Sequence, residues 1–389
     1  MNFVFYNPTR LVFGDGRFHE LSELAAGLGN RALLVTGRSA MQKTGHLDNA
    51  VEMLEQAGAR VTVFDHIPPN PTLEAIEDGG RLARETDCDF IVGLGGGSAM
   101  DSAKAIAVAA THDCNLREFL LPGENGVKRQ PTDDTLPVIA ITSTAGTSSE
   151  LTPFAVITMS DTCEKSAMGG PALYPHVAIA DPQLTRSLPP RITASTGMDV
   201  MCHALEGYVS TVANPITDVL ALHAIELVAL HLPHAVADGG DEDARRGMML
   251  ANCLAGYVLS QNGTNLMHAL EHPMSGRYPD LPHGEGLCAV LSAWAELMAE
   301  RQPDRLAAVA RRIGVQEADD VRAAAHTAEA LSQLLAQVGM DLCLNQLGVE
   351  PHMLDTLADD ALRYMHHALA KTPGQVTREH LTDILQASY

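Results

Sequence analysis

The stretch FIVGLGGGSAMDSAK, residues 90–104, decides the fold of the first half of the chain. Residues 90–94 are apolar enough for a buried strand, and the Ala-rich residues from 99 onward predict a helix. The glycines at 95–97 let the backbone approach a pyrophosphate without a Cβ clash, and the free N–H groups of the following helix attract such an anion. The stretch therefore predicts a phosphate-binding turn. An ordinary tight turn is the alternative, because the spacing departs from G-x-G-x-x-G.

Polar side chains in and after this turn extend the prediction. Ser98 is expected to cap the helix, with Asp101 completing a capping-box-like pair. A second loop, TSTAGTSSE at 142–150, follows a predicted strand at 137–141. Hydroxyl and N–H groups at the carboxyl end of a strand are well placed to bind ribose, phosphate or carboxamide, although a surface Ser/Thr loop would look the same. Two such loops after successive strands favour a nucleotide crevice.

The pattern divides the chain into two halves. In the first, apolar runs at 32–36, 60–64, 90–94 and 137–141 alternate with helix-length stretches at 46–57, 73–86 and 99–111, which is typical of a parallel sheet with crossover helices. In the second, stretches of helical period recur at 199–211, 215–230, 243–260, 286–300, 303–313, 321–338, 353–370 and 378–387. Prolines cluster between 180 and 191 and interrupt regular structure, which places the boundary between the two halves there. We expect a Rossmann-like α/β dinucleotide-binding domain at 1–185 and an all-α helical, metal-binding and catalytic domain at 186–389.

Composition narrows the class of partner. The chain has 389 residues, 46% of them hydrophobic, which is enough for two cores. A formal net charge of −22 repels phosphate backbones and anionic lipid, so we expect a small-molecule partner, with no nucleic acid and no membrane. The N-terminal residues lack the features of a secretory signal. The seven scattered cysteines contain no C-x-x-C pair and suit a reducing compartment, so we expect a cytoplasmic protein.

Carboxylate and imidazole side chains recur at helical spacing in the second half. Asp199 and His203 lie four residues apart, as do His268 and His272, and His283 follows on a loop bounded by Pro and Gly. One carboxylate with any three of these four imidazoles suits iron(II), zinc or manganese with a position open for an alcohol oxygen. With 17 histidines in the chain, such spacing also arises by chance. The Met, Leu and Ala neighbours favour a metal site, because an unpaired buried imidazole is costly. His231, His234, His366 and His367 lack such neighbours and are expected to be solvated.

Several motifs in order resemble those of the iron-containing (group III) alcohol dehydrogenase family. They are PTRLVFGDG at 8–16, PNPT at 69–72, the glycine loop at 95–104, TAGTSSE at 144–150, the 197–208 segment and the 268–284 segment. The resemblance spans nearly the whole chain. It implies an α/β dinucleotide-binding domain, a helical domain and a metal. The chain departs from the family's pattern at Asn265, at Ser275 and in a longer loop at 277–281, which affects the expected shape of the substrate pocket.

The resemblance assigns residues to roles. Asp199, His203, His268 and His283 fall on the metal ligands, and His272 on an additional active-site histidine near the nicotinamide. The cofactor positions fall on Gly37, Asn70, Gly96, Gly97, Ser98, Asp101, Thr142, Ser143, Thr147 and Lys165. The family also implies a homodimer or a larger homo-oligomer.

These assignments lead to a hypothesis of mechanism. We expect metal-dependent hydride transfer between NAD(P) and a small primary alcohol or diol, or the aldehyde in reverse, with Fe²⁺ as the metal and zinc possible. His272 is expected to relay the released proton, and a packed histidine that only supports the site is the alternative.

Cofactor preference is predicted from the end of the first nucleotide-binding strand. Gly37 stands where NAD enzymes place a carboxylate beside the ribose, and Arg38 follows, so we expect NADP(H) to be preferred and NAD(H) to be usable. The alternative is that Gly37 only permits a tight turn.

Other proteins could share these motifs. A glycerol dehydrogenase or a dehydroquinate synthase-like enzyme also combines dinucleotide and metal, and a non-catalytic nucleotide-binding scaffold could retain the fold. A fourth protein ligand favours the simple alcohol dehydrogenase, and the intact ligand set disfavours the scaffold.

Overall fold

The computed structural model describes residues 2–123 and 127–389, which form two compact units. Of the described residues, the α/β unit comprises 7–123, 127–144 and 148–187, and the helical unit comprises 188–389 together with 2–6 and 145–147. The two short segments lie within the range that the sequence analysis assigned to the first domain.

A parallel six-stranded sheet forms the centre of the α/β unit. Its order is β1-β8-β5-β4-β2-β3, and every neighbouring pair is parallel. The strands are β1 (Arg10–Phe13), β2 (Arg31–Gly37), β3 (Arg60–Ile67), β4 (Phe90–Gly95), β5 (Val138–Thr142) and β8 (Val177–Ala180). The expected α/β class is confirmed, and so are the four predicted strands, which became β2, β3, β4 and β5.

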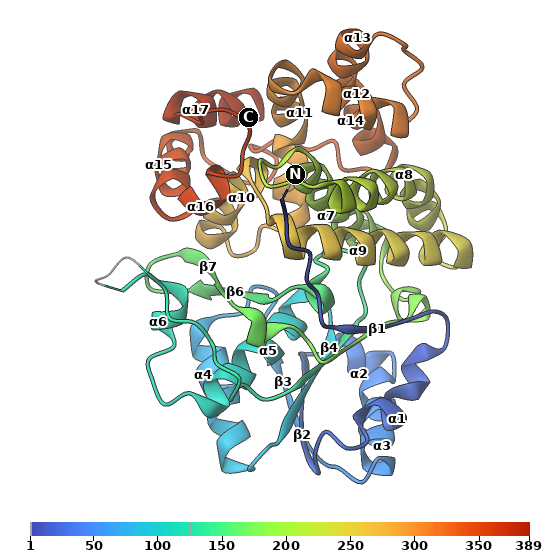
Figure 1. Ribbon diagram of the computed structural model, residues 1–389, viewed down its shortest axis with the longest axis vertical. Coiled ribbons are helices and arrows are strands. Elements are labelled where there is room, and N and C mark those ends of the chain that lie inside the picture. The colour runs from blue at the N-terminus through green and yellow to red at the C-terminus, as the bar shows by residue number, and fades with distance from the viewer. Residues whose placement is uncertain (1, 124–126) are drawn as a thin grey trace. The chain divides into compact units, whose positions relative to one another are not determined.

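Helices cover both faces of this sheet. Residues of β2 alternate, with Leu34 packing on the side of α1 (Leu21–Ala25) and α3 (His46–Gln56), and Leu33 on the side of α4 (Leu73–Glu85) and α5 (Gly97–Thr111). Figure 1 shows the two helix pairs on opposite sides of the sheet. Because both faces are buried, the inner strands β4 and β5 are almost entirely apolar, whereas the edge strand β3 also carries polar residues such as Asp65 and His66.

Shorter elements complete the α/β unit. They are α2 (Ala40–Lys43), α6 (Arg117–Leu120) and an antiparallel hairpin of β6 (Phe154–Met159) and β7 (Glu164–Gly169). The sequence analysis missed β1, β6, β7 and β8. β1 and β8 have only four residues each, and β7 begins with the polar residues Glu164, Lys165 and Ser166, so none of these three shows the apolar run by which the other strands were recognised.

The second unit is helical, as expected. Its helices are α7 (Pro190–Val209), α8 (Pro215–Ala237), α9 (Glu242–Asn262), α10 (Leu266–Arg277), α11 (His283–Arg301), α12 (Pro303–Arg312), α13 (Asp320–Ala325), α14 (Thr327–Gln337), α15 (Leu354–Tyr364), α16 (His366–Leu369) and α17 (Arg378–Ala387). The predicted helix at 321–338 is two helices, separated at His326, and the one at 353–370 is also two, separated at Met365. Apolar periodicity continues across both junctions, which conceals them in the sequence.

Helix α7 runs through the core of this unit. Nearly every residue from Thr193 to Val209 is buried, and the core around it includes Met198, Met201 and Trp294. Helix α8 is long and apolar enough to cross a membrane by length and composition, and about a third of its most apolar window is buried. Its buried residues, such as Ile225 and Val228, belong to the same core as α7. Length and composition alone are therefore weak evidence for a membrane span, because a core helix can have the same length and composition.

Candidate active site

The middle of α7 supplies two of the expected ligands. Asp199 and His203 are one helical turn apart and project from the same face, and both side chains are at most 6% exposed. Polar groups buried this deeply in an Ala- and Met-rich helix need partners, because burial without them costs free energy.

Helices α10 and α11 supply the other two. His268 is the third residue of α10, whose N-cap is Asn265. The Asn265 side chain accepts a hydrogen bond from the Leu266 N–H at 2.6 Å and donates one to the Glu206 carbonyl at 2.8 Å, which ties the start of α10 to α7. His283 is the first residue of α11. The expectation that His283 lies on a loop is therefore wrong, since Pro282 acts as the N-cap and starts a helix.

A glycine lets α11 begin this close to α7. A Cβ on Gly284 would lie 2.2 Å from the Ser195 carbonyl oxygen, which no larger residue could accept without a shift of the backbone. The close approach brings His283 beside the buried face of α7.

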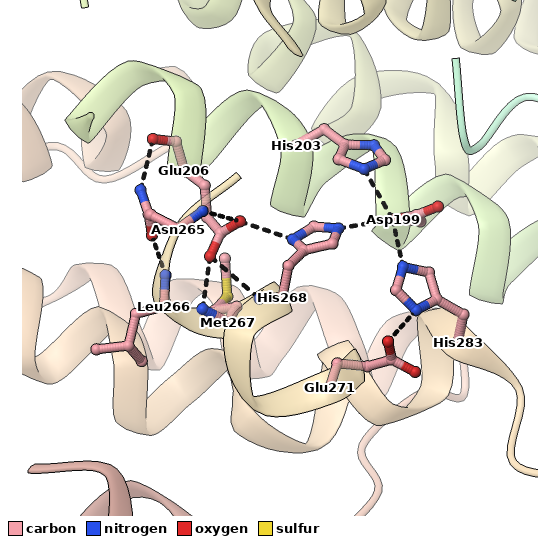
Figure 2. A network of polar contacts seen from close by, with 9 residues as sticks. All are labelled: Asp199, His203, Glu206, Asn265, Leu266, Met267, His268, Glu271 and His283. Carbon is pink, nitrogen blue, oxygen red and sulfur yellow. Dashed lines mark hydrogen bonds and ion pairs between the residues drawn. The ribbon is translucent and has the colours of Figure 1, made fainter. Parts of the chain in front are cut away.

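The four side chains meet at one carboxylate oxygen (Figure 2). Asp199 Oδ1 lies 3.5 Å from Nε2 of His203, 3.6 Å from Nε2 of His268 and 3.7 Å from Nε2 of His283. The His203 and His268 rings stack with centroids 4.7 Å apart. Three imidazole nitrogens and one carboxylate thus face a common point.

The electrostatics of this cluster depend on Asp199. Burial alone would raise the pKa of Asp199, but attraction to His203 and to the other two imidazoles outweighs burial and holds that pKa well below its usual range. Burial lowers the pKa of His203 to about 4, so this imidazole is neutral. Burial also opposes the charge on His268, but Glu206 and Asp199 raise the pKa of His268 to about 10.

The donor set fits a divalent metal ion. Within the described part of the chain, Asp199 Oδ1 and His268 Nε2 have no hydrogen-bond partner, although both atoms are buried. Buried polar atoms without a partner are rare unless an ion or water satisfies them. One carboxylate and three imidazoles match the preference of first-row divalent ions.

Two buried glutamates at this site escaped the sequence analysis. Glu206 accepts a hydrogen bond from Nδ1 of His268 at 2.6 Å, and Glu271 contacts Nδ1 of His283. Both side chains are fully buried. The available signal was an acidic residue three positions after a ligand on an otherwise apolar helix face.

His272 lies beside the ligands. It is 9% exposed, and its ring centroid is 6.2 Å from that of His268 and 5.8 Å from that of His283. Of the histidines expected to be solvated, His234, His366 and His367 are exposed. His231 is half-buried against Gly247, so that expectation is wrong for His231 because α8 packs closely on α9 at this point.

The expected cofactor loops gather at one edge of the sheet in the α/β unit. Strands β2, β4 and β5 are neighbours, and Gly95 pairs with Thr142 in register. The Ser143 N–H donates to the Gly95 carbonyl at 2.9 Å. The chain leaves β2 for β3 on one side and continues through β4 and β5 on the other, so the strand order reverses between β2 and β4. Ligands of open parallel sheets bind at such a reversal, outside the carboxyl ends of the strands.

The glycine turn has the geometry of a close backbone approach. Gly95 has φ +148°, which favours glycine, and a Cβ there would meet the Ala99 Cβ at 3.0 Å. Helix α5 begins at Gly97 with Gly96 as its N-cap. The expectation that Ser98 caps this helix is wrong, because Ser98 lies inside the first turn and its hydroxyl donates to the Pro69 carbonyl.

Further expected residues lie around this turn. Asn70 belongs to the same loop as Pro69, and the loop continues to Thr72, which bridges to Thr158 of β6. Lys165 pairs with Thr158 in the β6–β7 hairpin. Gly37 ends β2 opposite Ile67, and the Arg38 side chain after it is exposed. Thr147 belongs to the helical unit.

The charged side chains of Asp101 and Lys104 both have partners within the α/β unit. Asp101 accepts hydrogen bonds from the Ser149 hydroxyl and the Val156 N–H and pairs with Lys104 at 3.2 Å. The fully buried Lys104 ammonium also donates to the carbonyls of Ser149 and Phe154. These contacts tie α5 to the segment that follows the second polar loop.

Comparison with known proteins agrees with this arrangement. The model of the iron-containing alcohol dehydrogenase family matches residues 8–182, and that of the C-terminal domain of the Fe-containing alcohol dehydrogenase family matches residues 193–389. The chain therefore belongs to the iron-containing alcohol dehydrogenase family.

The relatives include alcohol and diol dehydrogenases. Alcohol dehydrogenase 4 of Schizosaccharomyces pombe is 36% identical over 99% of this chain and 89% of its own length, and the 1,3-propanediol dehydrogenase of Klebsiella pneumoniae is 34% identical over 93% and 92%. Among solved structures, an archaeal halo-thermophilic alcohol dehydrogenase from a Red Sea brine pool superposes with a TM-score of 0.96 at 36% identity, covering 100% of this chain and 99% of that one. A glycerol dehydrogenase, a dehydroquinate synthase-like enzyme and a non-catalytic scaffold are not favoured.

Proposed function

We propose that this protein is a metal-dependent, NAD(P)-dependent alcohol dehydrogenase that transfers a hydride between a nicotinamide cofactor and a small primary alcohol or diol, or the aldehyde in reverse. The observation that carries this proposal is the convergence of three imidazole Nε2 atoms, all within 3.7 Å of one buried Asp199 oxygen. Such a donor set with open positions serves Lewis-acid chemistry on an alcohol oxygen.

The proposed ligands of the metal are Asp199, His203, His268 and His283. Fe²⁺ is the proposed ion, with zinc as a possible substitute, because the family is defined by iron and the donors suit either ion. When bound, the ion supplies Lewis acidity that lowers the pKa of a substrate hydroxyl. The buried surroundings of Asp199 and His203 exclude bulk water from one side of the site.

The proposed role of His272 is to carry the released proton toward solvent. Its position beside the rings of His268 and His283 places it within the site without making it one of the four ligands. An imidazole titrates near neutral pH and can accept such a proton. A histidine that only packs against the ligands is the alternative, and the variant His272→Gln separates the two roles through the pH dependence of turnover.

The proposed dinucleotide site lies in the α/β unit, at the carboxyl ends of β2, β4 and β5. Its residues are Gly37, Arg38, Asn70, Gly96, Gly97, Ser98, Asp101, Thr142, Ser143 and Lys165. Thr147, which the family resemblance also assigns to the cofactor, belongs to the helical unit. Asp101 acts through its bonds to Ser149 and Val156, which tie the helix after the turn to the 149–156 segment. This assigns dinucleotide binding to residues 1–185 and metal binding and catalysis to residues 186–389.

NADP(H) is the proposed preferred cofactor, with NAD(H) usable. A Cβ on Gly37 would lie 3.8 Å from the nearest atom, the Ile67 carbonyl oxygen, and Gly37 lies outside the left-handed region of φ. The backbone therefore does not require glycine here, which counts against the tight-turn alternative. An exposed Arg38 adjacent to this position suits a 2′-phosphate. Among relatives, a sulfoacetaldehyde reductase from Bifidobacterium kashiwanohense was solved with NAD⁺, so the preference needs a direct test.

The proposed setting is the cytoplasm, with a small alcohol or aldehyde as the partner, no nucleic acid or membrane partner, and a homodimer or larger homo-oligomer as the assembly. The formal net charge of −22 supports the exclusion of polyanions.

One panel tests the proposed reaction. Metal-stripped protein is reconstituted separately with Fe²⁺ and Zn²⁺, and oxidation of NADPH and NADH is followed with short aldehydes and hydroxyaldehydes. We expect turnover that depends on metal and is highest with Fe²⁺. Equal turnover in the presence of excess chelator would refute the metal-dependent function, and full activity with zinc alone would refute the preference for iron.

A further inference from the structure

The three helices that carry the proposed ligands are linked by buried carboxylates. Helix α7 carries His203 and, three residues later, Glu206, which bonds His268, the ligand on α10. Helix α10 carries His268 and, three residues later, Glu271, which contacts the ligand of α11, His283. Each carboxylate thus lies on one ligand-bearing helix and supports the ligand on the next ligand-bearing helix (Figure 2).

The two supported imidazoles share one orientation. In both His268 and His283, Nδ1 faces a glutamate and Nε2 faces Asp199. A carboxylate oxygen only accepts hydrogen bonds, so each glutamate keeps a proton on Nδ1 and leaves the Nε2 lone pair for a metal. His203 differs, because its Nδ1 has no hydrogen-bond partner in the described part of the chain.

Burial makes these pairs consequential. Glu206 and Glu271 are both 0% exposed, and a carboxylate in such a place is retained only where charge-assisted hydrogen bonds offset its desolvation. Glu206 also accepts from the N–H groups of Asn265 and His268 at 3.0 and 3.3 Å, so it supports the start of α10 as well.

We propose that Glu206 and Glu271 are positioning residues that fix the Nδ1-protonated form and the ring orientation of His268 and His283, and so set the affinity of the site for its metal. This inference rests on the proposed metal site. Glu271 is the better residue to test, because Glu206 also holds backbone groups and its loss would disturb α10.

The test compares Glu271→Gln with a matched control, Glu285→Gln. Glu285 is 1% exposed and lies on the same helix as His283, but its side chain bonds the Arg191 guanidinium at 2.7 Å instead of an imidazole. Both substitutions keep side-chain volume and remove one buried charge. Metal-stripped proteins are titrated with Co²⁺ against a chelating dye, and the visible d–d spectrum of the bound ion is recorded.

We expect Glu271→Gln to bind Co²⁺ about 10- to 100-fold more weakly, with an altered d–d spectrum, and Glu271→Ala to bind more weakly still. Glu285→Gln should match the natural protein in affinity and spectrum. Unchanged affinity in Glu271→Gln, or an equal loss in Glu285→Gln, would overturn the inference. So would binding of two ions per chain that falls to one in Glu271→Gln, because Glu271 would then be a ligand. Absence of Co²⁺ binding by the natural protein would instead refute the proposed metal site.

A measurement on the natural protein covers the case in which Glu271→Gln does not fold. Zinc-loaded protein labelled with ¹⁵N-histidine should show long-range ¹H–¹⁵N correlations from a protonated Nδ1 and a metal-bound Nε2 at both His268 and His283. Metal bound through Nδ1 at either residue would contradict the inference.

Discussion

Replacing Asp199 with Asn tests the anionic member of the proposed ligand set. The substitution keeps side-chain volume and one oxygen donor but removes the only negative charge among the four side chains. In the natural protein this oxygen lies 3.5 to 3.7 Å from three imidazole nitrogens. Because loss of a residue that merely orients a ligand already weakens metal binding by about 10- to 100-fold, we expect loss of the charged ligand to weaken it by at least about 100-fold.

This loss of affinity predicts a measurable difference in stability. At a free metal concentration of about 100 times the natural dissociation constant, the natural protein gains about 2.7 kcal/mol of unfolding free energy from the ion. At the same concentration a variant with about 100-fold weaker binding gains only about 0.4 kcal/mol. The comparison is made for each protein with and without metal, so differences between the metal-free forms cancel.

The assay is urea unfolding of the helical unit, followed by the fluorescence of Trp294, the chain's single tryptophan, in metal-buffered solution. Asp360→Asn is the control, since Asp360 is a buried carboxylate of the same unit that pairs with Arg277 and Arg363. We expect this control to retain the full gain from metal. A gain in Asp199→Asn equal to that of the natural protein would refute the placement of the ion at Asp199.

Three further predictions concern the cofactor and pH. Gly97→Val should raise the KM for the dinucleotide by at least about tenfold, with little change in the KM for the aldehyde, because a Cβ would intrude at the first residue of α5, where the pyrophosphate is proposed to bind. Steady-state kinetics in both substrates measure this effect. An unchanged KM for the dinucleotide would contradict the proposed phosphate site. Gly37→Asp should change the ratio of kcat/KM with NAD(H) to kcat/KM with NADP(H) by about tenfold or more in favour of NAD(H), since the carboxylate repels a 2′-phosphate and accepts a hydrogen bond from a 2′-hydroxyl. A natural protein that already favours NAD(H) would contradict the proposed preference. Metal binding should release about one proton from His268, because the metal-free pKa of His268, about 10, lies above neutral pH and the metal-bound imidazole is neutral. The affinity for the metal should therefore fall about tenfold for each pH unit below this pKa. Calorimetry in buffers of different ionisation enthalpy measures the proton release, and a metal affinity independent of pH between about 7 and 9 would contradict the prediction.

The sequence predicted the elements that carry long, regular patterns. The apolar runs of β2, β4 and β5 reflect the helices that cover both faces of the sheet, and the glycine turn after β4 follows from residues 95–97. Asp199, His203 and His268 could be brought together because two of them share one helix turn and all three lie among Met, Leu and Ala. The family resemblance chose His283 over His272 as the fourth ligand, because the spacing of these two residues from the others does not decide between them.

Other features depend on tertiary contacts that local patterns do not encode. The Ser98 hydroxyl donates to the Pro69 carbonyl instead of capping the helix, because the 69–72 loop passes beside the glycine turn. His283 begins a helix because Gly284 permits close packing on Ser195, a residue 89 positions earlier in the chain. Glu206 and Glu271 resemble ordinary surface acids in the sequence, and only the folded chain places each against an imidazole.

Stepwise addition of Fe²⁺ to metal-stripped protein under anaerobic conditions, with bound iron and the rate of NADPH oxidation by an aldehyde measured at each step, tests the central claim most directly. The proposed site predicts that activity rises in proportion to bound iron and saturates at one ion per chain, and that His268→Ala and His283→Ala neither retain this ion nor gain activity. Full turnover before any metal is added, or full metal content and activity in either variant, would contradict it.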